Sequence, residues 1–138
     1  PSYNDFVDFV KNLAIKNNVL ITTGIIDFDL IQNLKINFFQ KKTDNIYLKN
    51  YSNTSVYFIY MPTFNDIESL LRNAKILITC HGAVTHAANS FNVKIVDIIE
   101  ENRKVFYQHY TSYLKKYNPI YRAKFDILKD DLLDIIRE

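Results

Sequence analysis

Glycine is scarce in this chain of 138 residues, which has two glycines, three prolines, one cysteine and no tryptophan. The P-loop and the dinucleotide-binding fingerprint both need several glycines within a few residues, whereas Gly24 and Gly82 lie far apart. Both motifs are therefore excluded. A single cysteine, Cys80, forms no internal disulfide, which fits a reducing, cytoplasmic setting.

Long hydrophobic runs and a strong charge of one sign are also missing. No apolar run approaches the roughly 20 residues that a membrane span needs, and the first residues lack the basic-then-apolar pattern of a signal peptide. The formal charge of +2 gives no sign of a nucleic-acid partner or of an anionic membrane surface. With 48% hydrophobic and 23% charged residues, the composition is that of a globular domain.

Apolar, β-branched runs alternate with amphipathic segments along the chain. The most continuous runs are Val19–Thr23, Lys75–Thr79 and Val93–Ile98, and we expect them among the central strands of one sheet. The alternation predicts an α/β fold with a doubly wound, mostly parallel sheet and helices on both faces. The length predicts a single domain over residues 1–138, and a doubly wound sheet would make this domain Rossmann-like.

Helix-start signals occur between these runs. Ser2 and Thr63 each precede an aspartate by three positions, the spacing of a capping box, and predict helices at about 2–16 and 63–74. Asp27 or Asp29 can cap another helix. The remaining expected elements are a strand near the sheet edge at 46–48, a long helix at about 104–117 and a last helix capped by Asp126.

The stretch 75–99 predicts a strand, a tight turn, a helix and a second strand. His81, Gly82 and Ala83 interrupt the apolar run, and the helix extends from Ala83 to Phe91. A small-residue turn between a parallel strand and a helix lets backbone N–H groups face a ligand, and the helix N-terminus adds partial positive charge. Two interpretations are about equally supported: a site for phosphate or another anion, and a plain tight turn in an α/β sheet.

The element order from Asp66 onward resembles the C-terminal domain of a glycosyltransferase with two Rossmann-like domains (the GT-B fold). The most similar family is the bacterial ADP-heptose:lipopolysaccharide heptosyltransferases, whose motif is a helix, a hydrophobic strand, Asp-Ser/Thr-Gly-Pro-x-His-x-Ala-Ala and then Gly-Val-Pro-Val-Val. The matching segments here are the helix 66–74, the strand 75–79, His86-Ala87-Ala88 and the strand 93–96.

One part of that motif differs. The family's Asp-Ser/Thr-Gly-Pro is replaced by His-Gly-Ala-Val at residues 81–84. A His-Gly-Ala turn at this place is more like other glycosyltransferase families, including one with xylosyl- and N-acetylglucosaminyltransferases. The resemblance therefore implies a nucleotide-sugar-binding domain and leaves the sugar and the nucleotide open.

The resemblance also implies a set of ligand contacts. The turn would hold the donor's diphosphate on its backbone amides, and Gly82 would permit close approach and unusual dihedral angles. The contacts in the turn are His81, Gly82, Ala83, Val84 and Thr85. From other segments, Thr22, Thr23 and Gly24 would approach the phosphate or sugar, Met61 and Pro62 would flank the base, and Glu100 would accept from the ribose hydroxyls. No metal or cofactor is implied, because the donor is a substrate.

The activity implied is transfer of a hexosyl or heptosyl group from a nucleotide-diphosphate sugar to a glycan or lipid-linked acceptor, in polysaccharide or lipopolysaccharide biosynthesis. The acceptor site, and often the catalytic base, belong to an N-terminal domain in such enzymes. Since the chain begins with Pro1, we expect it to be a piece that lacks this domain and is inactive alone. No catalytic residue is assigned. The expected location is the cytoplasm, with peripheral attachment to the inner membrane face as a further option, and neither nucleic acid nor a transmembrane segment is expected.

Two other interpretations are a non-catalytic, flavodoxin-like α/β binding module and half of a sugar-nucleotide epimerase. At the level of single residues, His81 is favoured as a ligand contact, and His86 is expected to anchor its helix by hydrogen bonds. A catalytic pair of Cys80 and His81 is disfavoured, because adjacent residues in extended chain point to opposite sides and no orienting acid is identifiable. Cys80 and the three histidines lack metal-ligand spacing.

Overall fold

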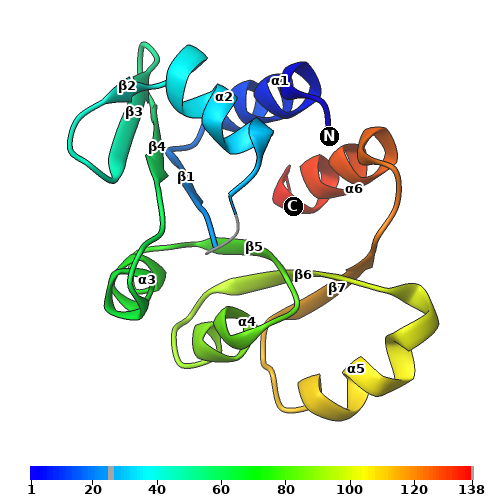
Figure 1. Ribbon diagram of the computed structural model, residues 1–138. Helices are drawn as coiled ribbons and strands as arrows, with labels where there is room; N and C mark the ends of the chain where they lie inside the picture. Colours follow the sequence, from blue (N-terminus) through cyan, green and yellow to red (C-terminus); the bar gives the residue numbers. More distant parts are fainter. Residues whose placement is uncertain (25–26, 138) are drawn as a thin grey trace. The chain divides into compact units, whose positions relative to one another are not determined.

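The computed structural model describes residues 1–24 and 27–137 and divides the chain into two compact units, Pro1–Pro62 and Thr63–Glu138 (Figure 1). The protein is mixed α/β, and each unit has its own sheet and its own hydrophobic core. The parallel sheet of the second unit, with its helices, is compatible with a Rossmann-like fold.

The first unit is a four-stranded mixed sheet with two helices. Its elements are α1 (Tyr3–Ala14), β1 (Val19–Thr22), α2 (Asp29–Asn37), β2 (Gln40–Lys41), β3 (Ile46–Asn50) and β4 (Ser55–Ile59). The strand order is β1-β4-β3-β2, with β1 parallel to β4 and β3 antiparallel to both of its neighbours. In β4, Val56 and Phe58 are buried, whereas Tyr57 between them is 41% exposed. This alternation shows that one face of the sheet carries the core, which includes residues of α1 and α2.

The two helix starts of the first unit differ. Ser2 accepts a hydrogen bond from the backbone N–H of Asp5, so the predicted cap of α1 is confirmed. The predicted cap of α2 is wrong, because its N-cap residue is Phe28 and no side chain caps it. The carboxylate of Asp27 instead accepts hydrogen bonds from Gln32 and from the hydroxyl of Tyr60.

The second unit is built on three parallel strands. Its elements are α3 (Phe64–Leu71), β5 (Ile76–Cys80), α4 (Ala83–Ala88), β6 (Lys94–Ile99), η1 (Glu101–Arg103), α5 (Lys104–Thr111), β7 (Tyr117–Tyr121) and α6 (Phe125–Arg137). The strand order is β5-β6-β7. Helices α4 and α5 lie on one side of this sheet and α6 on the other (Figure 1). The expectation of helices on both faces thus holds for this unit.

The strand positions correct several predictions. Of the three strands expected to be central, β6 is the one with a partner on both sides within the described residues, where β1 and β5 each lie at the edge of their sheet. Conversely, β3 was expected near an edge and lies between β4 and β2. The short strand β2 was not predicted. Two-residue strands carry no periodicity that a sequence could reveal.

The predicted long helix at 104–117 is also wrong. Helix α5 ends at Thr111, and Tyr117 already belongs to β7. The aromatic residues keep a helical spacing across this boundary, which explains the error. Pro119 lies within β7, where it is tolerated because β7 is an edge strand of its sheet in the described residues. Asp126 lies in the first turn of α6.

Candidate functional site

The second unit brings polar side chains to the carboxyl edge of its sheet. Strands β5, β6 and β7 end at Cys80, Ile99 and Tyr121. Because the strands are parallel, the residues that follow them meet at one edge, where open α/β sheets bind ligands. Those residues are His81, Glu100 and Arg122.

His81 is held by a buried aspartate on the middle strand. Its Nδ1 lies 2.7 Å from Oδ2 of Asp97, and the hydroxyl of Tyr117 donates to the same oxygen at 2.9 Å. The Asp97 side chain is 0% exposed, whereas that of His81 is 17% exposed. A carboxylate is an acceptor only, so Nδ1 carries a hydrogen and Nε2 is the nitrogen left for a ligand.

The imidazole of His81 is also enclosed by other rings. The ring of Tyr107, on α5, lies 4.7 Å away at 61°, and the ring of His86, on α4, lies 5.2 Å away at 86°. His86 itself is bonded through Nδ1 to the hydroxyl of Tyr113 at 2.6 Å. This hydrogen bond links α4 to the segment that follows α5.

Tyr117 remains a hydrogen-bond donor over a wide pH range. Burial raises the pKa of Tyr117 well above its ordinary value of 10.0, and the hydrogen bond to Asp97 raises it further. A hydrogen bond with Thr111 acts in the opposite direction and is the smaller effect. The hydroxyl therefore keeps its hydrogen for Asp97 at neutral pH.

The turn after β5 uses some of its own hydrogen-bonding groups. The N–H of Gly82 donates to Oγ1 of Thr85 at 3.2 Å, and the N–H of Thr85 donates to the carbonyl of Gly82 at 3.1 Å. Thr85 is fully buried. In the part of the chain that the structure describes, the N–H groups of Ala83 and Val84 have no acceptor, so they are the amides left for an anion.

Gly82 does not have the unusual dihedral angles expected of it. Its φ of 176° and ψ of −170° are extended backbone that any residue adopts. A Cβ built at this position would lie 3.8 Å from the carbonyl oxygen of Cys80, which is ordinary van der Waals contact. Unusual dihedral angles therefore do not explain the glycine, and close approach of a ligand to the backbone is the remaining predicted reason.

Cys80 and His81 have different partners. The thiol of Cys80 lies 3.8 Å from Nη2 of Arg122, and Nη1 of Arg122 lies 3.5 Å from Oε1 of Glu100. The carboxylate of Glu100, expected to bind a ribose, thus has a cation beside it. Both members of this ion pair are about half exposed, so the pair adds little to stability.

The predicted contacts of the first unit meet at the ends of β1 and β4. The N–H of Met61 donates to Oγ1 of Thr23 at 2.9 Å, so this hydroxyl satisfies a backbone group. Thr22 is the last residue of β1, and Pro62 is the last residue of the unit. Among the described residues, no atom outside its chain neighbours lies within 4 Å of a Cβ built on Gly24. Met61 has a φ of 49°, a left-handed conformation that is strained for a non-glycine residue.

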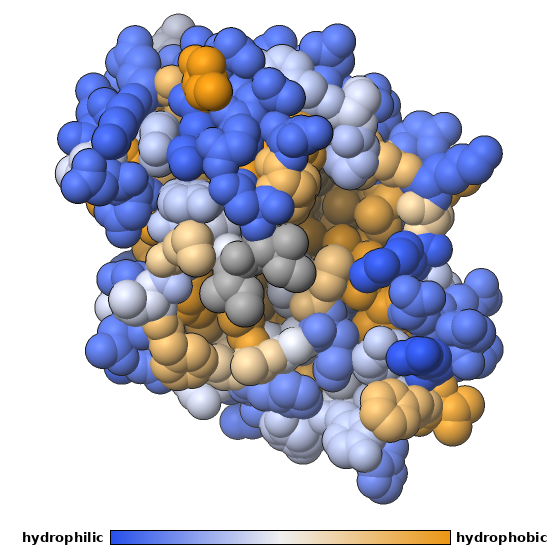
Figure 2. Space-filling model, viewed as in Figure 1, coloured by the Kyte–Doolittle hydropathy of each residue, from blue (hydrophilic) through white to orange (hydrophobic). Residues whose placement is uncertain are grey.

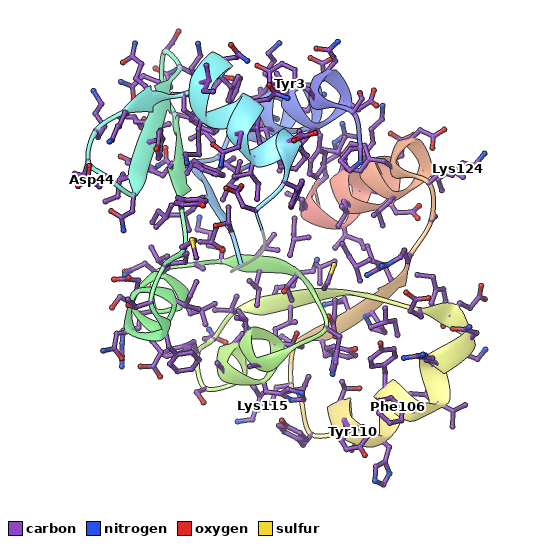
Figure 3. All side chains as sticks on the ribbon, viewed as in Figure 1. Tyr3, Asp44, Phe106, Tyr110, Lys115 and Lys124 are labelled. Atoms are coloured by element: carbon purple, nitrogen blue, oxygen red, sulfur yellow. The ribbon has the colours of Figure 1, made fainter. Side chains whose placement is uncertain are left out.

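An exposed aromatic surface adjoins His81 in the second unit. Tyr107 contacts Phe106 with ring centroids 5.7 Å apart, and Phe106 contacts Tyr110 at 4.8 Å. Phe106 and Tyr110 are 58% and 48% exposed, and Figure 3 labels both on α5. Figure 2 shows hydrophobic atoms over the same helix, at the lower right. The row of rings therefore continues from His81 to the surface.

Sequence reasoning missed Asp97 and Tyr117. Asp97 is the only acidic residue in the run Val93–Ile99, and an acid within a buried strand is a usable signal. It was overlooked because its partner His81 is 16 residues away. Tyr117 was assigned to a helix, so it could not be placed beside Asp97.

The described residues, 1–24 and 27–137, contain no group of three or more His, Cys, Asp or Glu side chains that could hold a metal ion. Within the same residues, the helices are all too short or too polar to cross a membrane. Comparison with protein-family models, with curated proteins and with solved structures gave no match. The function must therefore be argued from the geometry of the site.

Proposed function

We propose that this chain is the donor-binding domain of a GT-B glycosyltransferase, a doubly wound half that binds a nucleotide-diphosphate sugar for transfer to a glycan or glycolipid acceptor. One observation carries the proposal. At the carboxyl edge of a parallel sheet, His81 follows a strand and is fixed through Nδ1 by a fully buried Asp97 on the next strand. That edge is where α/β sheets of this kind bind nucleotides.

The chemistry of the turn suits a diphosphate. Nδ1 of His81 faces Asp97, so Nε2 is the nitrogen directed away from it. When both nitrogens carry a hydrogen, the ring is an imidazolium. Its Nε2–H then donates to a phosphate oxygen, and Asp97 is the counter-charge. The N–H groups of Ala83 and Val84 are two further donors. Helix α4 has only six residues, so its dipole adds little to these donors.

Calorimetric titration of UDP and ADP into the wild type and two variants tests this proposal. His81→Ala removes one charge-assisted hydrogen bond and should weaken binding by about 1–3 kcal/mol. Gly82→Val should weaken it more and abolish nearly all binding, because a branched side chain blocks approach to the backbone amides. Valine suits the extended backbone at this position, so the variant should fold.

A third variant and a spectroscopic check complete the design. His109→Ala is the matched control, because His109 is exposed on α5 and its ring packs on that of Tyr110. It should bind as the wild type does, and circular dichroism should show all variants folded. Wild-type binding by a folded Gly82→Val variant would contradict the proposal and favour the non-catalytic α/β module.

A further inference from the structure

We propose that Asp97 and Tyr117 are positioning residues. They hold the ring of His81 with Nδ1 toward Asp97, so that Nε2–H of the imidazolium meets the anionic part of the ligand and Asp97 supplies the counter-charge. This inference rests on the proposed function and extends it to two residues that make no ligand contact themselves. It assigns a role to the one buried acidic side chain among the residues that the structure describes.

The first argument is geometric. An imidazole near the surface can rotate about χ2 and exchange its two nitrogens. The 2.7 Å contact between Nδ1 of His81 and Oδ2 of Asp97 is in the range of a charge-assisted hydrogen bond and selects one of these orientations. In metal sites, a carboxylate that bonds the other ring nitrogen fixes the orientation of a histidine ligand in the same way. The rings of Tyr107 and His86 pack against the same imidazole and limit its movement.

The second argument is the cost of burying Asp97. Its side chain is fully buried, and its Oδ1 has no hydrogen-bond partner in the described part of the chain. A buried carboxylate destabilises a core unless hydrogen bonds compensate it, and here two donors converge on Oδ2 alone. An apolar residue would serve the core better, so stability does not explain Asp97.

The third argument is the rigidity of the support. The register of the sheet places Asp97 beside Thr79 of β5 and Pro119 of β7. The three linked side chains come from the end of β5, from β6 and from β7, so they are held by consecutive strands. Tyr117 donates to the oxygen that His81 uses and thereby fixes the carboxylate. A site on strands is held more precisely than a site on loops.

Nitrogen-15 NMR of the histidine rings in the free protein tests the positioning directly. In the wild type, His81 should show a protonated Nδ1 in its neutral form. In Asp97→Asn, the amide group can donate to Nδ1, so the ring hydrogen should move to Nε2. A merely structural role of Asp97 predicts lower stability with unchanged affinity for anions.

Titration with inorganic pyrophosphate and with UDP then tests the consequence for binding. Asp97→Asn should lower affinity about 10-fold, because a neutral ring that donates from Nε2 replaces an imidazolium whose charge Asp97 balances. Tyr117→Phe keeps the shape of the core and should lower affinity less, with the wild-type tautomer retained. This second variant keeps the test decisive if Asp97→Asn does not fold.

Tyr113→Phe is the matched control. It removes a tyrosine hydroxyl from the neighbouring His86, 2.6 Å away, and should leave both the tautomer of His81 and the affinity unchanged. An unchanged tautomer in Asp97→Asn overturns the inference, and so does a changed tautomer with full affinity. If the wild type binds neither pyrophosphate nor UDP, the proposed function itself fails, whereas a failure of positioning alone leaves wild-type binding intact.

Discussion

At the scale of single residues, Asp97 departs most from what its surroundings require. A middle strand buried on both faces needs apolar side chains, and the neighbours of Asp97 in β6 meet that need. Local departures from the rules of packing concentrate where a protein binds or reacts. The hydrogen bonds of Asp97 lead to His81 and Tyr117, and only His81 reaches the sheet edge.

Tyr117 gives the network a signature at high pH. Because burial and Asp97 raise the pKa of Tyr117 in the folded protein, the neutral phenol stabilises the fold below pH 10.0, the ordinary value. That contribution is lost as the pH rises through the folded value, so wild-type stability should fall above pH 10. We expect a smaller fall in Tyr117→Phe, measured by urea denaturation at pH 8 and at several values above 10.

The control for this titration is Tyr113, a tyrosine whose hydroxyl bonds a histidine and not Asp97. Tyr113→Phe should show the same alkaline fall as the wild type, because Tyr113 is exposed and its hydroxyl bonds His86 and not a buried carboxylate. Equal alkaline profiles for the wild type and Tyr117→Phe would contradict the argument.

At the scale of elements, the capping box of α3 is the clearest local signal in the chain. Thr63 accepts from the N–H of Asp66 at 3.2 Å, and the carboxylate of Asp66 accepts from the N–H of Thr63 at 2.8 Å. Both bonds join residues three positions apart, which is why the sequence predicted this helix start correctly.

Thr63→Ala should therefore destabilise the protein by about 1 kcal/mol, as loss of an N-cap side chain does. The side-chain and backbone hydrogen bonds of Thr63 hold the pKa of Asp66 below its ordinary value of 3.8. That stabilisation is present above pH 3.8 and is lost as the pH falls through the lower folded value. The difference between the wild type and Thr63→Ala should accordingly shrink in acid, as chemical denaturation at pH 7 and below pH 3.8 can show.

Ser69→Ala is the matched control on the same helix. The hydroxyl of Ser69 donates to the carbonyl of Asn65 at 2.9 Å within α3, so its loss should change stability by less than about 0.5 kcal/mol. A loss as large as that of Thr63→Ala would show that the cap has no special role.

At the scale of the whole molecule, the proposed function predicts binding without turnover. The chain should bind UDP or ADP weakly, because only one wall of the donor cleft would be present to desolvate the ligand. It should transfer no sugar from a nucleotide-sugar donor to a glycan or glycolipid acceptor. Rapid transfer by the chain alone, measured by release of nucleoside diphosphate, would contradict the assignment of the acceptor site to another domain.

The sequence by itself determined the local features of this protein. The N-cap at Ser2, the capping box at Thr63, the amphipathic helices and the strand-turn-helix-strand order of 75–99 are local features. They depend on residues within one or two turns of each other. These signals were sufficient for the α/β class. They also located the turn at His81, because an interrupted apolar run is visible in the sequence.

Only the tertiary structure decided the strand order and the partners of the turn. In the part of the chain that the structure describes, β3 lies inside its sheet and β5 lies at the edge of its own, because neighbours in a sheet depend on pairing between distant segments. Tyr117 is 20 residues from Asp97, and a helical spacing of aromatics concealed that it lies on a strand. The network of His81, Asp97 and Tyr117 exists because parallel pairing of β6 with β5 and β7 brings three separate segments together, and no local pattern encodes that pairing.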